Sequence, residues 1–218
     1  MSPALPGSRG LFSALQDALG RADRNRVRIT PLIWDLAADF TAIADSLRER
    51  PTRLQELVPG EPTFIGASDA SGLGMGGMCW FSANPGHHPI LWRQQFPPKE
   101  TAALVTSSNP HGAISFSDLE LTALIAHKDI LTSEHDTAEH TLWLATDNMA
   151  ALSWSTKGSA TSVGPRSYLL RYNALHQRAH RYVAVHDHIA GTANAMADDA
   201  SRLWHLSNDN LLTHFNLT

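Results

Sequence analysis

Two similar segments of the chain end in an aspartate. Asp69 follows Ala67-Ser68, and Asp147 follows Ala145-Thr146, so each apolar run closes on a small hydroxyl residue and a carboxylate. If the two runs are neighbouring parallel strands, both aspartates lie at the same carboxyl edge of a sheet, where α/β proteins usually bind ligands. Carboxylates held close together repel each other unless a cation joins them.

Ligands that are all oxygen favour Mg²⁺ or Mn²⁺ over zinc. The two strand ends therefore predict a site for a divalent cation. The alternative for either aspartate alone is a helix N-cap or a turn residue after a strand.

The segments that must position these aspartates can be located from turn residues and apolar spacing. A boundary is expected near residue 62, where prolines and a Pro59-Gly60 turn separate two amphipathic helices from a region of different texture. Beyond it, short apolar runs predict strands at 63–69, 75–81, 90–96, 141–147 and 182–189, and helices at 118–131, 148–157, 166–180 and 194–204. The expected organisation is a helical N-terminal extension (1–62), an α/β domain (63–204) and a C-terminal tail (205–218).

Composition narrows the class of protein. The chain has 218 residues, a net charge of −4 and one cysteine, Cys79, so an internal disulfide and a multi-cysteine zinc site are excluded. No apolar run is long enough to predict a membrane span, and residues 1–10 do not have the apolar stretch of a secretory signal. We expect an intracellular protein, in the cytoplasm or the nucleus, with no membrane partner.

Five motifs in order resemble the ribonuclease H domains attached to retroelement reverse transcriptases. They are Asp69-Ala70-Ser71-Gly72, Glu120-Leu121-Thr122-Ala123-Leu124, Thr146-Asp147-Asn148, His188-Ile189-Ala190-Gly191-Thr192-Ala193-Asn194 and Ala197-Asp198-Asp199-Ala200-Ser201-Arg202. The resemblance covers about residues 63–204. It implies an α/β fold with a five-stranded mixed sheet, three strands antiparallel and then two parallel, flanked by helices.

The same resemblance implies a function. The metal-binding carboxylates would be Asp69, Glu120, Asp147 and Asp198, holding two Mg²⁺ ions that Mn²⁺ can replace, and His188 would assist proton transfer or product release. The substrate implied is an RNA/DNA hybrid, of which the RNA strand is hydrolysed.

Several residues have a second interpretation. Ser117-Asp118-Leu119-Glu120 also fits a capping box, in which Glu120 would only hold the start of its helix. Asp198 and Asp199 are about 100° apart on a helix, so only one can face the metals, and the spacing of four from Asn194 favours Asp198. His186 and His188 could begin a zinc site, but no further ligands are evident.

Two apolar features are assigned to packing. The glycine-rich run Gly72–Gly77 lacks the lysine of a phosphate-binding loop and is interpreted as a hairpin turn with close strand packing. Trp143, Trp154 and Trp204 are assigned to the core.

Basic charge is concentrated in one segment. Five basic residues and no acidic residue lie between Asn148 and His186, although the net negative charge argues mildly against a general nucleic-acid binder. We expect this segment to follow substrate phosphates, with ordinary solvated surface charge as the alternative. The residues expected to contact substrate are Ser71, Asn148, Lys157, Arg166, Arg171, Arg178 and Asn194.

Two rival functions are open. An integrase or transposase would need a glutamate downstream of its second aspartate, and no glutamate follows Glu139. A catalytically degenerate ribonuclease H-like module would bind nucleic acid or serve a structural role. Residues 1–62 weakly resemble the helices that connect a polymerase to its nuclease, so a reverse-transcriptase polymerase domain in cis is a candidate partner, and the oligomeric state stays open.

Overall fold

A computed structural model describes residues 9–20, 26–83, 86, 88–160 and 164–217. The first eight residues of the expected N-terminal extension lie outside this range. The helices are α1 (Arg9–Gly20), α2 (Pro31–Glu49), α3 (Pro98–Ala102), α4 (Phe116–Glu134), α5 (Met149–Lys157), α6 (Pro165–His180), α7 (Ala195–Arg202) and α8 (Asn208–His214), with short 3₁₀ turns η2 (Leu54–Glu56) and η3 (Gly191–Ala193). The strands are β1 (Pro62–Ala70), β2 (Gly74–Phe81), β3 (Ile90–Gln95), β4 (Thr141–Thr146) and β5 (Val183–His188).

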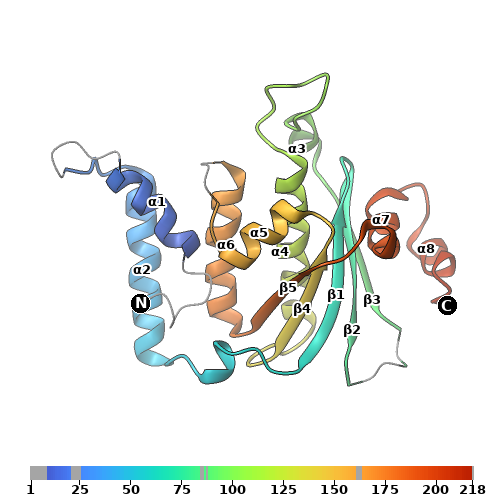
Figure 1. The fold of residues 1–218 in the computed structure, drawn as a ribbon, viewed down its shortest axis with the longest axis horizontal. Helices are drawn as coiled ribbons and strands as arrows, with labels where there is room; N and C mark the ends of the chain where they lie inside the picture. The colour runs from blue at the N-terminus through green and yellow to red at the C-terminus, as the bar shows by residue number, and fades with distance from the viewer. Residues whose placement is uncertain (1–8, 21–25, 84–85, 87, 161–163, 218) are drawn as a thin grey trace.

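The five strands form one mixed sheet in the order β3-β2-β1-β4-β5. The pairs β1–β2 and β2–β3 are antiparallel, whereas β1–β4 and β4–β5 are parallel. The predicted fold class is therefore confirmed. Because β1 and β4 are parallel neighbours, their carboxyl ends meet at one edge of the sheet (Figure 1).

Helices cover the two faces of the sheet unequally. The helices α4, α5 and α6 lie on one side, with α1 and α2 outside α6, while α7 and then α8 lie on the other (Figure 1). Leu121 and Leu124 of α4 pack with Leu142 and Leu144 of β4 in the main core cluster. Burying a leucine side chain contributes about 2 kcal/mol, so this contact anchors α4 on the sheet. None of the described helices is long and apolar enough to cross a membrane.

The approach of α7 to the sheet depends on glycine. A Cβ atom on Gly76 would lie 2.6 Å from the Cβ of Ala200, and one on Gly74 would lie 2.3 Å from the ring of Trp204. The clash at Gly76 would push α7 away from β2, and the clash at Gly74 would displace Trp204, which follows α7. The glycine-rich run therefore serves close packing, between a strand and a helix as well as between strands.

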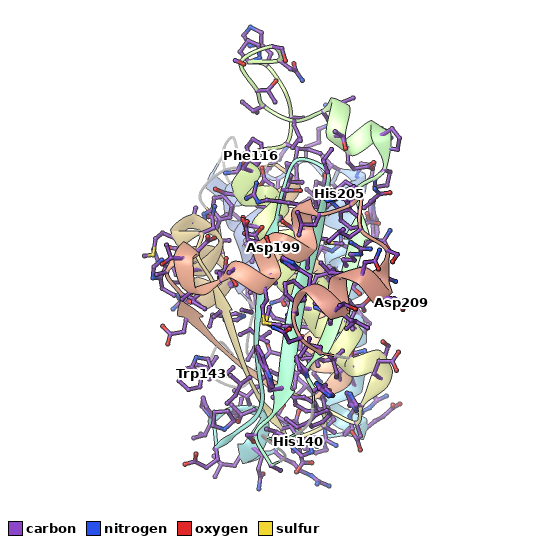
Figure 2. All side chains as sticks on the ribbon, turned by 90° about the vertical axis from the view of Figure 1, so that its right-hand side faces the viewer. Phe116, His140, Trp143, Asp199, His205 and Asp209 are labelled. Carbon is purple, nitrogen blue, oxygen red and sulfur yellow. The ribbon has the colours of Figure 1, made fainter. Side chains whose placement is uncertain are left out.

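One tryptophan was assigned wrongly to the core. Trp143 of β4 is 38% exposed and lies in register with Ile65 of β1, which is 40% exposed. Figure 2 shows Trp143 beyond α7 on the face that this helix covers only in part. Leu142 and Leu144, which alternate with Trp143, face the helices on the opposite side. Trp154, in contrast, packs against the main core cluster.

The N-terminal helices dock on α6 through apolar and charged contacts. Leu11 of α1, Ile43 of α2 and Ala174 of α6 form a buried cluster. Beside it, Glu56 is only 4% exposed and accepts hydrogen bonds from Arg181, at 2.6 Å, and from Arg178, at 3.3 Å. Burial acts to raise the pKa of Glu56, but the hydrogen bonds from Arg181 and from the backbone N–H of Arg53 outweigh it, so the pKa is lowered.

We predict that Glu56→Ala destabilises the protein by about 3 kcal/mol, because it leaves the partly buried guanidinium of Arg178 without its carboxylate and removes one of the two carboxylates, Glu56 and Glu139, that bind Arg181. Chemical denaturation measures the change, with Glu49→Ala, at the exposed end of α2, as the control. A loss below about 0.5 kcal/mol for Glu56→Ala would contradict a buried ion-pair anchor.

Candidate metal centre

Three of the four predicted carboxylates come together at the shared edge of β1 and β4. One oxygen from each of Asp69, Glu120 and Asp147 lies within 4.8 Å of the other two. Asp69 and Glu120 are 2% and 7% exposed, and Asp147 is partly buried. Three elements far apart in the sequence, β1, α4 and the end of β4, therefore supply one acidic cluster.

The start of α4 decides between the two interpretations of Glu120. Ser115 is the N-cap residue, and its backbone N–H donates to Asp118 Oδ2 at 2.8 Å, while Asp118 N–H donates to Ser115 Oγ at 3.2 Å. The capping box is thus formed by Ser115 and Asp118, and the interpretation of Glu120 as the capping residue is wrong. Glu120 Oε2 is buried and has no hydrogen-bond partner among the described residues.

Burial and mutual repulsion change the acidity of the cluster. Burial, followed by the charges of Asp69 and Asp147, raises the pKa of Glu120 to about 9. Burial also raises the pKa of Asp69 to about 6, against a hydrogen bond from Ser201 that lowers it and the charges of Asp198 and Asp147 that raise it further. Without a cation, the cluster therefore retains a proton on Glu120 at neutral pH.

The cluster suits a divalent cation of the Mg²⁺ or Mn²⁺ type. Its donors are all carboxylate oxygens, which such ions prefer. The unpartnered Glu120 Oε2 would gain a ligand bond, and the cation charge would remove the repulsion that holds the proton on Glu120. No histidine joins a metal-like group in the part of the chain that the structure describes, so the zinc alternative gains no support.

The two neighbouring aspartates of α7 point to different partners. Asp198 Oδ1 accepts a hydrogen bond from Arg202 Nε at 2.6 Å, and the charge of Asp198 acts on Asp69. Asp199 Oδ2 lies 2.9 Å from His214 Nε2 of α8. Asp198 is thus on the side of the acidic cluster, although it is not in the group of three, and its role as a fourth ligand stays a prediction.

His188 lies at the exposed end of β5, beside the cluster. It pairs in register with Thr146, the residue before Asp147. The loop that follows touches the site, because a Cβ atom on Gly191 would lie 3.0 Å from Asp147 Oδ2. His186, two residues earlier, has a buried Nε2 atom, and burial lowers its pKa well below the usual value.

Three of the polar residues expected to bind substrate are engaged with the backbone. Asn148 caps α5 by accepting hydrogen bonds from Ala150 N–H and Ala151 N–H. The amide of Asn194 donates to the carbonyl of Ser68 at 3.3 Å, and Ser71 Oγ donates to the carbonyl of Ser201 at 2.6 Å. These side chains hold the loops around the cluster.

The arginines expected to bind phosphates are paired within the chain. Arg166 contacts Asp118 at 3.1 Å and lies over the ring of Trp154 at 4.7 Å. Arg171 pairs with Asp39 of α2, and Arg178 binds the segment 46–56. Lys157, in contrast, is exposed in the last turn of α5. Most of the local positive charge is therefore neutralised by the N-terminal extension and α4.

Ser201 and Arg202 contact the site, but their place in the last motif predicted no role for either of them. Ser201 Oγ donates a hydrogen bond to Asp69 Oδ2 at 2.7 Å, and Arg202 Nη2 lies 3.9 Å from the same oxygen. Their spacing of three and four residues from Asp198 places all three on one side of a helix, which is the signal that could have found them.

No protein-family model and no curated protein matches the chain. Solved structures with a similar chain path include an RNase H1 from the halophilic archaeon Halobacterium salinarum NRC-1, with 13% identity and a TM-score of 0.44 over 63% of this chain and 92% of that one. LC11-RNase H1 in complex with an RNA/DNA hybrid has 17% identity and a TM-score of 0.45, over 63% of this chain and 92% of that one. The protease-reverse transcriptase of prototype foamy virus has 12% identity and a TM-score of 0.32 over 84% of this chain, which spans 22% of the viral protein.

We predict that the metal-free protein loses stability as the pH rises from 6 to 8.5. Glu120 has an ordinary pKa of 4.5 and a folded-state pKa of about 9, so the folded state holds a proton that the unfolded state has released. The stability from this proton is full below pH 4.5, decreases steadily as the pH rises from 4.5 toward 9, and is lost above pH 9. Glu120→Gln should remove about 2 kcal/mol of that loss in chemical denaturation with chelator present.

Glu61→Gln, at an exposed position, is the control and should retain the wild-type pH dependence. Added Mg²⁺ should stabilise the wild-type protein more at pH 8.5 than at pH 6, because the ligands must be ionised. An equal pH dependence in wild type and Glu120→Gln would show that the cluster does not hold this proton.

Proposed function

We propose that the protein is a ribonuclease H-type endonuclease that hydrolyses the RNA strand of RNA/DNA hybrids. One observation carries the proposal, namely that Asp69, Glu120 and Asp147 are held within 4.8 Å at the carboxyl edge of a mixed sheet. Buried carboxylates in contact destabilise a fold, so such a cluster is best explained by a cation with which it acts.

The residues that would hold the metal are Asp69, Glu120 and Asp147, with Asp198 as the fourth. Two Mg²⁺ ions, which Mn²⁺ can replace, fit this oxygen-only donor set. When bound, the ions supply positive charge that activates water and stabilises the leaving 3′ oxygen of a phosphodiester. Asp69 is the most buried of the three clustered carboxylates and is also bound by Ser201 of α7, so we propose that it would be a central ligand of the site.

The products follow from the bond that breaks. Water adds to the phosphorus atom and the bond to the 3′ oxygen breaks, which leaves a 5′-phosphate and a 3′-hydroxyl. A proton must leave the attacking water and another must reach the leaving oxygen. We assign one of these transfers, or assistance in product release, to His188, because it is exposed at the end of β5 beside the cluster.

Charge around the site makes substrate binding dependent on the metal. Arg166, Arg171 and Arg178 already have carboxylate partners, and the chain has a net charge of −4. The bound cations would therefore supply much of the attraction for phosphate, with the exposed side chain of Lys157, in the last turn of α5, as a further basic contact. Contacts to 2′-hydroxyl groups would distinguish RNA from DNA.

The origin of the chain is a separate part of the proposal. The order of the five motifs supports descent from a retroelement polyprotein, in which a polymerase domain would precede the nuclease and residues 1–62 would be part of the connection. We propose an intracellular location on the same grounds.

The test of the activity is incubation with labelled RNA/DNA hybrid, duplex DNA and duplex RNA in Mg²⁺ or Mn²⁺. Wild-type protein should cut the RNA of the hybrid only, and Asp147→Asn should lower the rate by more than about 100-fold because it removes a metal ligand charge. Asp45→Asn, in an exposed surface pair of α2, should retain the wild-type rate.

The other outcomes separate the rival functions. Metal-dependent binding of the hybrid without cleavage would favour a degenerate module, and processing of DNA ends would favour an integrase or transposase. Cleavage of the hybrid that survives Asp147→Asn would remove the carboxylate cluster from the mechanism.

The fourth ligand has its own test, because two adjacent aspartates provide a matched pair. Asp198→Asn should reduce hybrid cleavage by about 10-fold or more, whereas Asp199→Asn should leave it unchanged, since Asp199 faces His214. The measurement is the rate of hybrid cleavage by the two variants and by wild type at equal Mg²⁺ concentration. The reverse order of the two effects would assign the role to Asp199.

A further inference from the structure

Ser201 is a buried residue of α7, and it contacts the acidic cluster from the face of the sheet opposite α4 (Figure 1). Its exposed fraction is 0%, and its Oγ atom lies 2.7 Å from Asp69 Oδ2 and 2.9 Å from the carbonyl oxygen of Asp198. A serine hydroxyl has one proton to donate. An ionised carboxylate is the stronger acceptor, so the proton is directed to Asp69.

The backbone at Ser201 is fixed on both sides. Its carbonyl accepts hydrogen bonds from Ser71 Oγ and from Trp204 Nε1, each at 2.6 Å. Its N–H is packed against β2, since a Cβ atom on Gly76 would lie 3.0 Å from Ser201 N. The hydroxyl is therefore presented to Asp69 from a rigid support.

Arg202, the other donor near Asp69, is too distant to hydrogen-bond with it. Arg202 Nη2 lies 3.9 Å from Asp69 Oδ2, beyond hydrogen-bond distance, and its side chain is half exposed. Within the described residues, Ser201 provides the one side-chain hydrogen bond to this carboxylate.

We propose that Ser201 is a positioning residue that holds the Asp69 carboxylate in the orientation that receives the divalent cation. The proposal rests on the proposed function for the use of the site, and it adds a residue outside the four carboxylates. A partner that orients a metal ligand commonly changes metal affinity by about 10–100-fold when it is removed.

The test is metal binding by the full chain. Isothermal titration with Mg²⁺, and separately with Mn²⁺, should show about 10-fold weaker binding by Ser201→Ala than by wild type. Ser155→Ala is the matched control, because Ser155 is also a buried helical serine whose hydroxyl bonds a carbonyl of its own helix, at 2.7 Å, and it lies on α5 away from Asp69. The control should bind both ions as wild type does.

A second readout separates positioning from a purely structural role. In hybrid cleavage, Ser201→Ala should need about 10-fold more Mg²⁺ for half-maximal rate, and its kcat should return to within about 2-fold of wild type at saturating Mg²⁺. If Ser201→Ala fails to fold, Ser201→Cys keeps a group of similar size with a weaker donor and should show the same direction of change.

Folded Ser201→Ala that binds Mg²⁺ with wild-type affinity would overturn the proposal, as would a lower rate that excess Mg²⁺ does not restore. Wild-type protein that binds Mg²⁺ but leaves the hybrid intact would instead count against the proposed nuclease, while weaker binding by Ser201→Ala would still support the role of Ser201.

Discussion

The repulsion among three carboxylates at one sheet edge is the constraint on which the rest of the site depends. Asp69, Glu120 and Asp147 would separate if their backbones could move, since each gains water and distance from the others. Parallel pairing of β1 with β4 prevents this for the two aspartates, and the packing of Leu121 and Leu124 prevents it for α4. The most buried part of the core thus lies beside the least favourable charges, as expected where stability is traded for a functional site.

The packing of α7 on the other face of the sheet depends on glycine residues of β2, which have no side chain. Gly74 and Gly76 let α7 approach β2 closely enough for Ser201 to reach Asp69. Arg93 of β3 binds the segment that follows α7. Its guanidinium donates to the carbonyls of Leu203 and Leu206 and stacks on the ring of Trp204. A glycine run next to a carboxylate resembles a phosphate-binding loop in composition, yet here it determines how closely a helix can pack.

The sequence predicted site residues correctly where a chemically reactive side chain follows a clear secondary-structure pattern. Asp69 and Asp147 follow apolar runs, so their common edge could be predicted once the strands were taken as parallel neighbours. Glu120 could not be separated from a cap, because Ser115 and Ser117 both lie near the start of the helix and only the backbone geometry selects Ser115 as the N-cap. Strand alternation placed Trp143 opposite the leucines of β4, but it could not indicate that α7 stops short of that position.

Ion pairs between residues far apart in the sequence cannot be predicted from a local pattern. They change the interpretation of the basic segment between Asn148 and His186. Asp39 and Glu56 are more than 100 residues from the arginines of α6 that they bind, Arg171 and Arg178. Arg166, at the start of α6, in turn contacts Asp118, which caps α4 two residues before Glu120. The extension therefore supports α6, α6 supports the start of α4, and that start positions Glu120 in the acidic cluster. A chain beginning at residue 62 would leave the partly buried side chains of Arg171 and Arg178 without their carboxylate partners, so we infer that the extension contributes to the stability of the α/β domain.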